Sequence, residues 1–424
     1  MADTTDKNTS NGNIDPSSAA KTLSETVKAL DLFTAALKEL SGLDFVNNPL
    51  SGLVSAFKKM YSEVLAVDTA MTALYRVTDE TDAKYDSFLN RASSKAKELG
   101  RTVSSLVEQT AEWSKLGYGL DLAEKLAGVS SVYAAVTGVS DDTAVSDISA
   151  SMKAFNIEAS DAITIVDRLV ALSSRYQVDS GDLGNSLADN ASALASAGNS
   201  IDETLALITA MSGITQNTSE AGEALKDLSM RIRGYDEDTG TYTGSVDELS
   251  NKIASLTKTA STPDGISLFT DNTNETCKTT YRLLSEISLI WNELSAKNQT
   301  GILEALTESR YSQAFSSLIS GMSQADAALG VSVNSYGSAY EKQEELMQSL
   351  EGKTNRFKAA FQSLSDTVLD SGLLKFFVDL GTGTVSVLDN LIDRLDMLPV
   401  AVSAIYTAVS AKKAVVWQST LLLS

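Results

Sequence analysis

Proline is almost absent from this sequence, and its distribution constrains the fold more than any other feature. The 424 residues contain only Pro16, Pro49, Pro263 and Pro399. Proline removes a backbone N–H and clashes with the preceding helical turn, so helices end where it occurs. Nothing between Pro49 and Pro263 imposes such a break. Apolar residues recur there at three- and four-residue spacing and rarely alternate at a period of two, which predicts an all-α fold.

Composition indicates a folded protein that does not bind nucleic acid. Hydrophobic residues make up 43% of the chain, which is enough to bury at least one large core. The formal net charge is −21. Such a surface repels phosphate, because nucleic-acid affinity comes mainly from lysine and arginine displacing counterions. It also disfavours anionic membrane surfaces. We therefore expect no direct nucleic-acid binding.

Two absences restrict the chemistry. The chain contains no histidine and a single cysteine, Cys277. It therefore lacks the commonest general base, the serine–histidine and cysteine–histidine nucleophiles, and most zinc sites. One cysteine cannot form an internal disulfide, which suits a reducing compartment.

Residues 1–20 are polar, carry no signal-peptide pattern and are expected to be a disordered tail. We expect the protein to be made and kept in the cytosol.

Helix and turn signals divide the rest of the chain into segments. The short helix 246–256 is expected inside the linker, next to an irregular stretch that contains Pro263. The expected segments are an N-terminal helical segment (21–63), a core helical domain (64–235), a loop or linker (236–274), a second helical region (275–394) and an apolar C-terminal segment (395–424).

Within the core segment, capping residues repeatedly precede helices of ten to twenty residues, and glycine follows them. This recurring pattern is typical of short helices packed in a globular bundle. The sequence shows no repeat of fixed period, so a regular solenoid is disfavoured. The expected caps are Ser105 with Glu108, Ser140, Ser160, Ser200 with Glu203, and Asn217 with Glu220.

A longer helix is expected over residues 340–369. Its apolar residues are spaced close to a 3.5-residue heptad, from Leu346 and Leu350 through Phe357 and Phe361 to Val368. Such spacing favours coiled-coil pairing. We expect this helix to pair with another copy of the chain or with a neighbouring helix.

The C-terminal segment, 395–424, is unusually apolar. Met397 to Ala411 is uncharged, but this run falls short of the roughly 20 residues that span a bilayer. A buried or interfacial helix is favoured, and membrane insertion through 395–423 is the alternative. The ending Leu421-Leu-Leu-Ser424 suggests a truncated chain.

Candidate sites fail on inspection. The loop that begins at Asp236 resembles a calcium loop, but Thr241 stands at the sixth position, which requires glycine, and Asp247 at the twelfth, which requires glutamate. Paired carboxylates such as Asp141 and Asp142 point about 100° apart on a helix. Cys277 has no histidine partner. We predict no catalytic, cofactor-binding or metal site.

The glycine pairs and the tryptophans are expected to have structural roles. Gly117-Tyr-Gly119 and Gly381-Thr-Gly383 are expected to end helices. Trp113, Trp291 and Trp417 are expected to anchor hydrophobic cores.

Several segments then occur in an order that identifies a family. They begin with an opening helix, continue through an alanine-rich helix that ends in glycine, and finish with a glutamate- and alanine-rich helix. They are Val67-Asp-Thr-Ala-Met-Thr-Ala-Leu, Ala96-Lys-Glu-Leu-Gly-Arg, Ala111-Glu-Trp-Ser-Lys-Leu-Gly-Tyr, Met152-Lys-Ala-Phe-Asn-Ile, Ala206-Leu-Ile-Thr-Ala-Met-Ser-Gly and Ser219-Glu-Ala-Gly-Glu-Ala-Leu-Lys. Downstream, Gly265-Ile-Ser-Leu-Phe and Phe357-Lys-Ala-Ala-Phe continue the pattern. This order resembles the tail tape-measure proteins of long-tailed bacteriophages.

The resemblance implies a non-enzymatic structural protein. Such proteins set tail length, nucleate polymerisation of the tail tube, occupy its lumen in the virion, and assist genome ejection. The partners it implies are the tail-tube protein, tail assembly chaperones, and tail-tip or baseplate proteins. A fully helical chain of 424 residues would reach roughly 640 Å. The short capped helices argue for folding back instead, so this chain is expected to be the globular core portion, with an extended ruler elsewhere. The alternative is a membrane-active, channel-forming helical protein.

Overall fold

The computed structural model describes residues 65–348, apart from 237–240, 243–244, 271–275 and 308. These residues belong to one compact unit, and they are helical almost throughout, as predicted. The described strands are only β1 (Tyr235–Asp236) and β2 (Thr241–Tyr242), which pair antiparallel with Tyr235 opposite Tyr242. The expectations for residues 1–63 and 395–424 lie outside the described residues.

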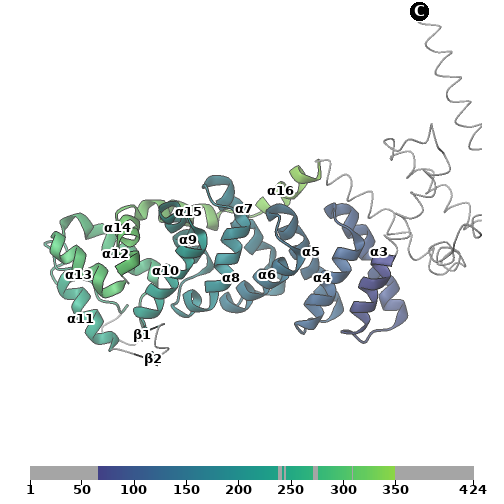
Figure 1. Ribbon diagram of the computed structural model, residues 1–424, viewed down its shortest axis with the longest axis horizontal. Helices are drawn as coiled ribbons and strands as arrows, with labels where there is room; N and C mark the ends of the chain where they lie inside the picture. The colour runs from purple at the N-terminus through teal and green to yellow at the C-terminus, as the bar shows by residue number, and fades with distance from the viewer. Residues whose placement is uncertain (1–64, 237–240, 243–244, 271–275, 308, 349–424) are drawn as a thin grey trace, which may run out of the picture. The chain divides into compact units, whose positions relative to one another are not determined.

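The N-terminal half of the described chain is a succession of amphipathic helices (Figure 1). They are α3 (Asp82–Leu99), α4 (Val103–Lys115), α5 (Leu120–Thr137), α6 (Asp141–Phe155), α7 (Ile163–Arg175), α8 (Ser180–Ser196), α9 (Ile201–Thr215) and α10 (Thr218–Arg231). A 3₁₀ turn, η1 (Ala159–Asp161), precedes α7.

The C-terminal half follows the short β pair. Its helices are α11 (Val246–Leu256), α12 (Thr280–Ile290), α13 (Ala296–Leu306), α14 (Ser312–Ser320), α15 (Met322–Val333) and α16 (Ser338–Met347). The 3₁₀ turns η2 (Trp291–Glu293) and η3 (Ser309–Tyr311) extend α12 and introduce α14. The helix predicted over 246–256 is confirmed.

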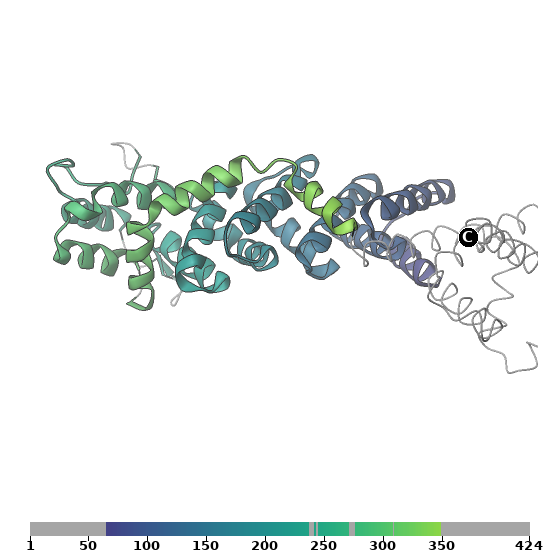
Figure 2. The ribbon, with the colours of Figure 1, turned by 90° about the horizontal axis from the view of Figure 1, so that it is seen from above.

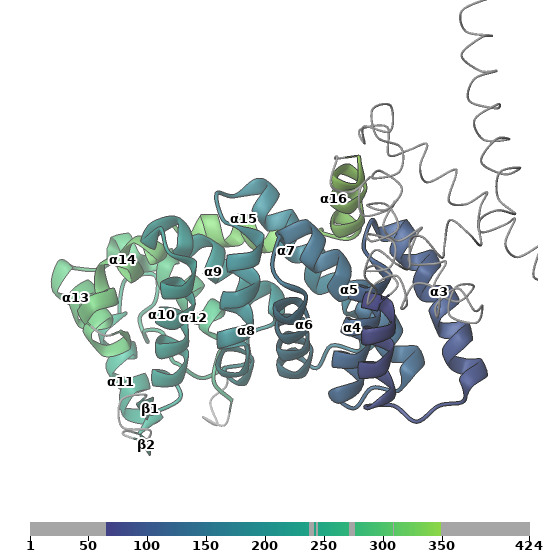
Figure 3. The ribbon, with the colours of Figure 1, turned by 45° about the vertical axis from the view of Figure 1, so that its right-hand side comes forward.

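Neighbouring helices stack in two layers. In the first layer α4, α5, α6, α8 and α10 pack each against the next, and α3 packs against α4 and α5. In the second, α7 and α9 pack across α8, and Figure 3 shows them lying over this row. Helices α12 and α14 pack against α9 on the far side. Each helix buries its apolar stripe against these neighbours.

The last two helices return along the molecule. Helix α15 packs against α9 and α7, and α16 packs against α7 and α5. Figure 2 shows this light-green segment running back over helices that precede it by far in the sequence. The chain therefore leaves the described unit beside the helices at which it enters.

Several helix starts follow the predicted capping chemistry. The Ser200 hydroxyl accepts from the Glu203 N–H at 3.1 Å, while the Glu203 carboxylate accepts from the Ser200 N–H at 2.9 Å, which completes a capping box. Ser140 caps α6 through the Thr143 N–H, and Asn217 caps α10 through the Glu220 N–H. These three caps are confirmed.

Two predicted caps are wrong. Helix α4 begins at Val103, two residues before Ser105, because Thr102 is the cap and its hydroxyl accepts from the Ser105 N–H at 3.2 Å. Ser160 caps no helix, since it lies inside η1, and α7 begins at Ile163 with no side-chain cap. Ser105 lies three residues before Glu108, and Ser160 lies directly before Asp161. Both therefore match a capping pattern, but neither stands at the first position of a helix.

A single hydrophobic cluster runs from Val67 to Ala339. Its largest fully buried side chains include Trp113, Tyr133, Phe88 and Phe315. Trp113 and Trp291 are buried, as predicted, whereas Trp417 lies outside the described residues.

The division of the chain into two helical regions by a linker at 236–274 stays a prediction.

The expectations for the long helix and the membrane segment are tested only in part. Helix α16 covers the start of the 340–369 prediction, and residues 349–369 lie outside the described part. Among the described helices none combines the length and apolar character that crossing a bilayer requires. The membrane-active alternative depends on 395–423, outside these helices, and stays a prediction.

Candidate functional site

An interior polar network joins the first three helices of the row. The Arg101 guanidinium, just ahead of α4, forms an ion pair with Asp141 at the start of α6, and the Ser105 hydroxyl donates to the same carboxylate. The Arg101 and Asp141 side chains are only 20% and 27% exposed. An ion pair that is this well shielded is stronger than a surface pair, but each charge also becomes costly to leave alone.

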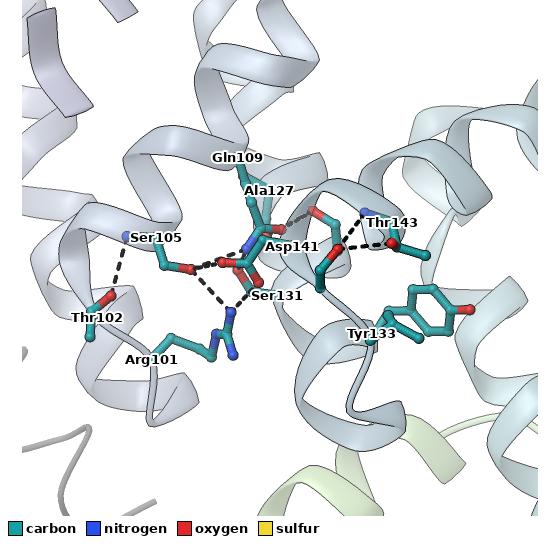
Figure 4. Close-up of polar contacts among 12 residues, drawn as sticks. Arg101, Thr102, Ser105, Gln109, Ala127, Ser131, Tyr133, Asp141 and Thr143 are labelled. Carbon is teal, nitrogen blue, oxygen red and sulfur yellow. Dashed lines mark hydrogen bonds and ion pairs between the residues drawn. The ribbon is translucent and has the colours of Figure 1, made fainter. Parts of the chain in front are cut away.

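The network continues inward along α4 (Figure 4). The Gln109 amide, 1% exposed, donates to Ser131 of α5 at 2.9 Å and accepts from the Ser130 hydroxyl. Ser130 also accepts from the Trp113 indole N–H at 3.1 Å. Polar groups of α4 and α5 are thus paired inside an apolar core. Such networks are favourable only in one relative placement of the helices, so this one fixes how α4, α5 and α6 align.

A second polar contact joins α5 to α6. The Tyr133 hydroxyl donates to Asp147 Oδ2 at 2.9 Å, and both side chains are buried. Burial raises the pKa of Asp147 to about 6; repulsion from Asp189 adds to this rise, and the Tyr133 hydrogen bond opposes it. Burial and the same carboxylate raise the pKa of Tyr133 well above its usual range.

Helix α8 approaches its neighbours through glycine and small polar residues. A Cβ at Gly184 would lie 1.9 Å from the Tyr133 hydroxyl, and a Cβ at Gly222 of α10 would lie 2.3 Å from Ser186 Oγ. These distances are far below van der Waals contact, so a side chain at either position would have to displace its neighbour. The close approach lets α10 pack at short range on α8 and lets the Tyr133 side chain of α5 reach the α8 backbone.

A polar cleft of about 610 Å³ opens where the α7–α8 and α9–α10 turns meet. Its lining includes Asp179, Asp182, Asp189, Gln216 and Asn217. Asp179 caps α8 through the Gly181 and Asp182 N–H groups. Neither Asp182 nor Asp189 forms an ion pair with a described residue. The cleft is strongly acidic, and serine and threonine side chains line part of it.

The residues considered as sites from the sequence are spread over the structure. Asp236 lies in β1 and Asp247 in the first turn of α11, with 237–240 between them outside the described residues. Across the described part of the chain, no group of three or more acidic, cysteine or histidine side chains is placed to hold a metal ion. Gly117 has a φ of 96° after the end of α4, and Gly119 precedes α5, so this pair ends one helix and starts the next.

Cys277 is half-buried beside Arg233. Its backbone pairs with Phe269 in an isolated bridge, and Arg233 donates to the Lys278 carbonyl at 3.2 Å. Burial lowers the pKa of Arg233, and the neighbouring Cys277 thiol opposes that shift. Cys277 thus belongs to the packing at the base of α12.

Sequence reasoning did not find the polar network. Its members lie on different helices, and the ion pair joins residues 101 and 141 across the whole of α4 and α5. The one sequence signal for this network is the presence of polar residues on apolar helix faces. Gln109, Ser130 and Ser131 each interrupt such a face.

The fold and its polar interior define an all-α protein whose helices are aligned with one another by buried hydrogen bonds and ion pairs. The family model for phage-related minor tail proteins matches residues 93–308, which is half of the chain. The chain belongs to this family, and the family assigns it a structural role in the phage tail. No solved structure matches the chain.

Proposed function

We propose that this chain is the core portion of a tail tape-measure protein. The family match over 93–308 supports a tail role, and the ordered segments from Val67 to Phe357 resemble tape-measure proteins in particular. In this role the protein sets tail length, nucleates polymerisation of the tail tube and occupies the tube lumen until the genome is ejected.

The observation that carries the proposal is the alignment of many short helices by internal polar contacts within the family region. The Arg101–Asp141 pair, the Gln109 network and the Tyr133–Asp147 bond all lie within residues 93–308. A body fixed in this way is suited to present a constant surface to subunits that assemble on it. We propose that the described residues supply assembly contacts and that tail length is measured by other parts of the protein.

The proposed work is structural and not catalytic. The chain has no histidine, and the Arg101–Asp141 and Tyr133–Asp147 pairs are engaged with one another between packed helices. The proposed partners are the tail-tube protein, tail assembly chaperones, tail-tip or baseplate proteins, and further copies of this chain. The proposed locations are the virion tail lumen and, during assembly, the host cytoplasm.

Cross-linking mass spectrometry on purified tails and assembly intermediates tests this proposal. Asp/Glu-reactive and Lys-reactive reagents suit a chain with 55 acidic and 34 basic residues. Cross-links from residues 65–348 to tail-tube or tail-tip subunits are expected. If the protein is absent from particles and is recovered only from cytosol or membranes, the tape-measure proposal is wrong.

A genetic test separates assembly from measurement. Phage carrying a substitution that destabilises the described unit, such as Asp141→Ala, should yield few tails, and those that form should have normal length in electron micrographs. Asp142→Ala, on the exposed neighbouring residue, is the matched control and should leave tail yield unchanged. Tails of altered length from Asp141→Ala would contradict the proposed separation of roles.

A further inference from the structure

Helix α16 is attached to the unit in a different manner from the other helices. It packs against α7 and α5, across a four-residue connection (334–337) from α15. Gly337 there has a φ of 86°, which favours glycine, and Tyr336 is 91% exposed. The connection is therefore a surface turn, and α16 is held by what it contacts on α5, α7 and α3.

The N-terminus of α16 is capped by a residue from far away. Asp167 of α7, 2% exposed, accepts from the Ala339 N–H at 2.9 Å, and no side chain of α16 or its preceding turn caps this end. A carboxylate stabilises a helix N-terminus by neutralising free N–H groups and the positive end of the dipole. Asp167 forms no ion pair with a described residue, so this cap is its principal partner.

A second contact joins α16 to the end of α3. The Gln343 amide, 4% exposed, donates to the Leu99 carbonyl, which is free because α3 ends there. The Gln343 Oε1 atom is buried and has no hydrogen-bond partner among the described residues. An unpaired buried acceptor costs free energy comparable to a lost hydrogen bond, so this contact is only half satisfied.

Apolar burial contributes little to this attachment. Ala339 and Gln343 are the buried residues of α16, whereas α9 buries ten of its residues. Among the described residues, the attachment of α16 therefore depends on the Asp167 cap, the Gln343 contact and a small apolar face.

We propose that α16 is a latch helix that undocks while the rest of the unit stays folded. Undocking exposes the Asp167 carboxylate and the Leu99 carbonyl on the surface that α16 covers. Both are acceptors, and neither has another described donor for that position.

Hydrogen exchange on the full chain tests the latch. Amides of α16 should exchange at least about tenfold faster than those of α7 and α9, because local opening requires less free energy than global unfolding. Asp167→Ala should raise α16 exchange a further five- to tenfold and leave α9 unchanged, in line with the loss of a helix cap. Glu344→Ala, on an exposed residue of the same helix, is the matched control and should change nothing.

A second variant covers the case in which Asp167→Ala disturbs α7 itself. Gln343→Ala removes the contact from the α16 side, and it should also raise exchange in α16 alone. Spin labels at Glu344 and Ser174, with Cys277→Ser, should report two distances whose balance shifts towards the longer one in Gln343→Ala. Equal protection of α16, α7 and α9 in the unmodified chain, or loss of protection in all three with Gln343→Ala, would overturn the proposal.

Discussion

The Tyr133 hydroxyl and the Asp147 carboxylate form a buried hydrogen bond of 2.9 Å that joins α5 to α6. It also lies against α8, because Tyr133 occupies the space that a side chain at Gly184 would need. Three helices therefore depend on the position of one tyrosine. Stability measurements on substitutions at these residues report directly on the arrangement.

Stability should depend on pH through Asp147. Its pKa is raised to about 6 in the folded protein from 3.8, so the folded state holds this proton more tightly than the unfolded chain. The contribution is fully present below about pH 4 and is lost as pH rises through 6. Asp147→Asn keeps an acceptor for Tyr133 without the charge. It should raise the urea midpoint at pH 7.5 and have little effect at pH 4.5.

Asp189→Asn is the companion test for the same group. Removing this carboxylate should lower the pKa of Asp147, since repulsion from Asp189 contributes to its rise. The pH at which stability declines should move downward in denaturation curves collected between pH 4 and 8. An unchanged pH profile in both variants would show that Asp147 titrates normally.

Glycine at 184 should be essential for packing. Gly184→Ala places a Cβ 1.9 Å from the Tyr133 hydroxyl, and the tyrosine is held by its bond to Asp147. We expect a loss of about 2 kcal/mol in the free energy of unfolding, as for other overpacked cores. Gly213→Ala in α9 is the control: no atom lies within 4 Å of its Cβ, and helix propensity should make it stabilising by about 0.5–1 kcal/mol. Equal effects at both positions would contradict the packing argument.

The Arg101–Asp141 pair should contribute measurably to stability. Asp141→Ala leaves the Arg101 guanidinium without its carboxylate and the Ser105 hydroxyl without its acceptor. A loss of about 2 kcal/mol is expected, because a shielded charge loses its partner. Asp142→Ala changes the next residue, which is exposed, and should stay within about 0.5 kcal/mol. The comparison uses chemical denaturation at pH 7.5.

The capping box of α9 should behave as the sequence suggests. Ser200→Ala removes the acceptor for the Glu203 N–H and should cost about 1 kcal/mol. Ser196→Ala, at the exposed end of α8, is the comparison and should be close to neutral. An unchanged melting temperature in Ser200→Ala would show that this cap does not stabilise α9.

Much of the fold was predictable because its signals are local. Low proline content, three- and four-residue apolar spacing and side-chain caps are each contained within one helix. Ser200 with Glu203 and Asn217 with Glu220 were identified in this way. Ser105 and Ser160 show the limit of such local signals, because each fits the capping pattern and neither caps a helix. Thr102 caps α4 in place of Ser105, and Ser160 lies in a 3₁₀ turn.

The polar interior was not predictable, because every link in it is between helices. Nothing in the spacing of Arg101 and Asp141 indicates that they meet, and the same holds for Asp167 and Ala339. Gly184 could be recognised only as an unusual residue within a helix. Its reason, the hydroxyl of a tyrosine on another helix, becomes visible only when α5 and α8 are placed together.

The return of α15 and α16 has a mechanical consequence. Because Gln343 of α16 is bonded to Leu99 at the end of α3, the chain enters and leaves the described unit within the same group of helices. A tensile load applied at the two ends of the described unit would pass through α3, α5 and α16 and would bypass α8 to α14. Helices α8 to α14 would then add bulk to the unit and almost nothing to the distance between the two points at which the load is applied.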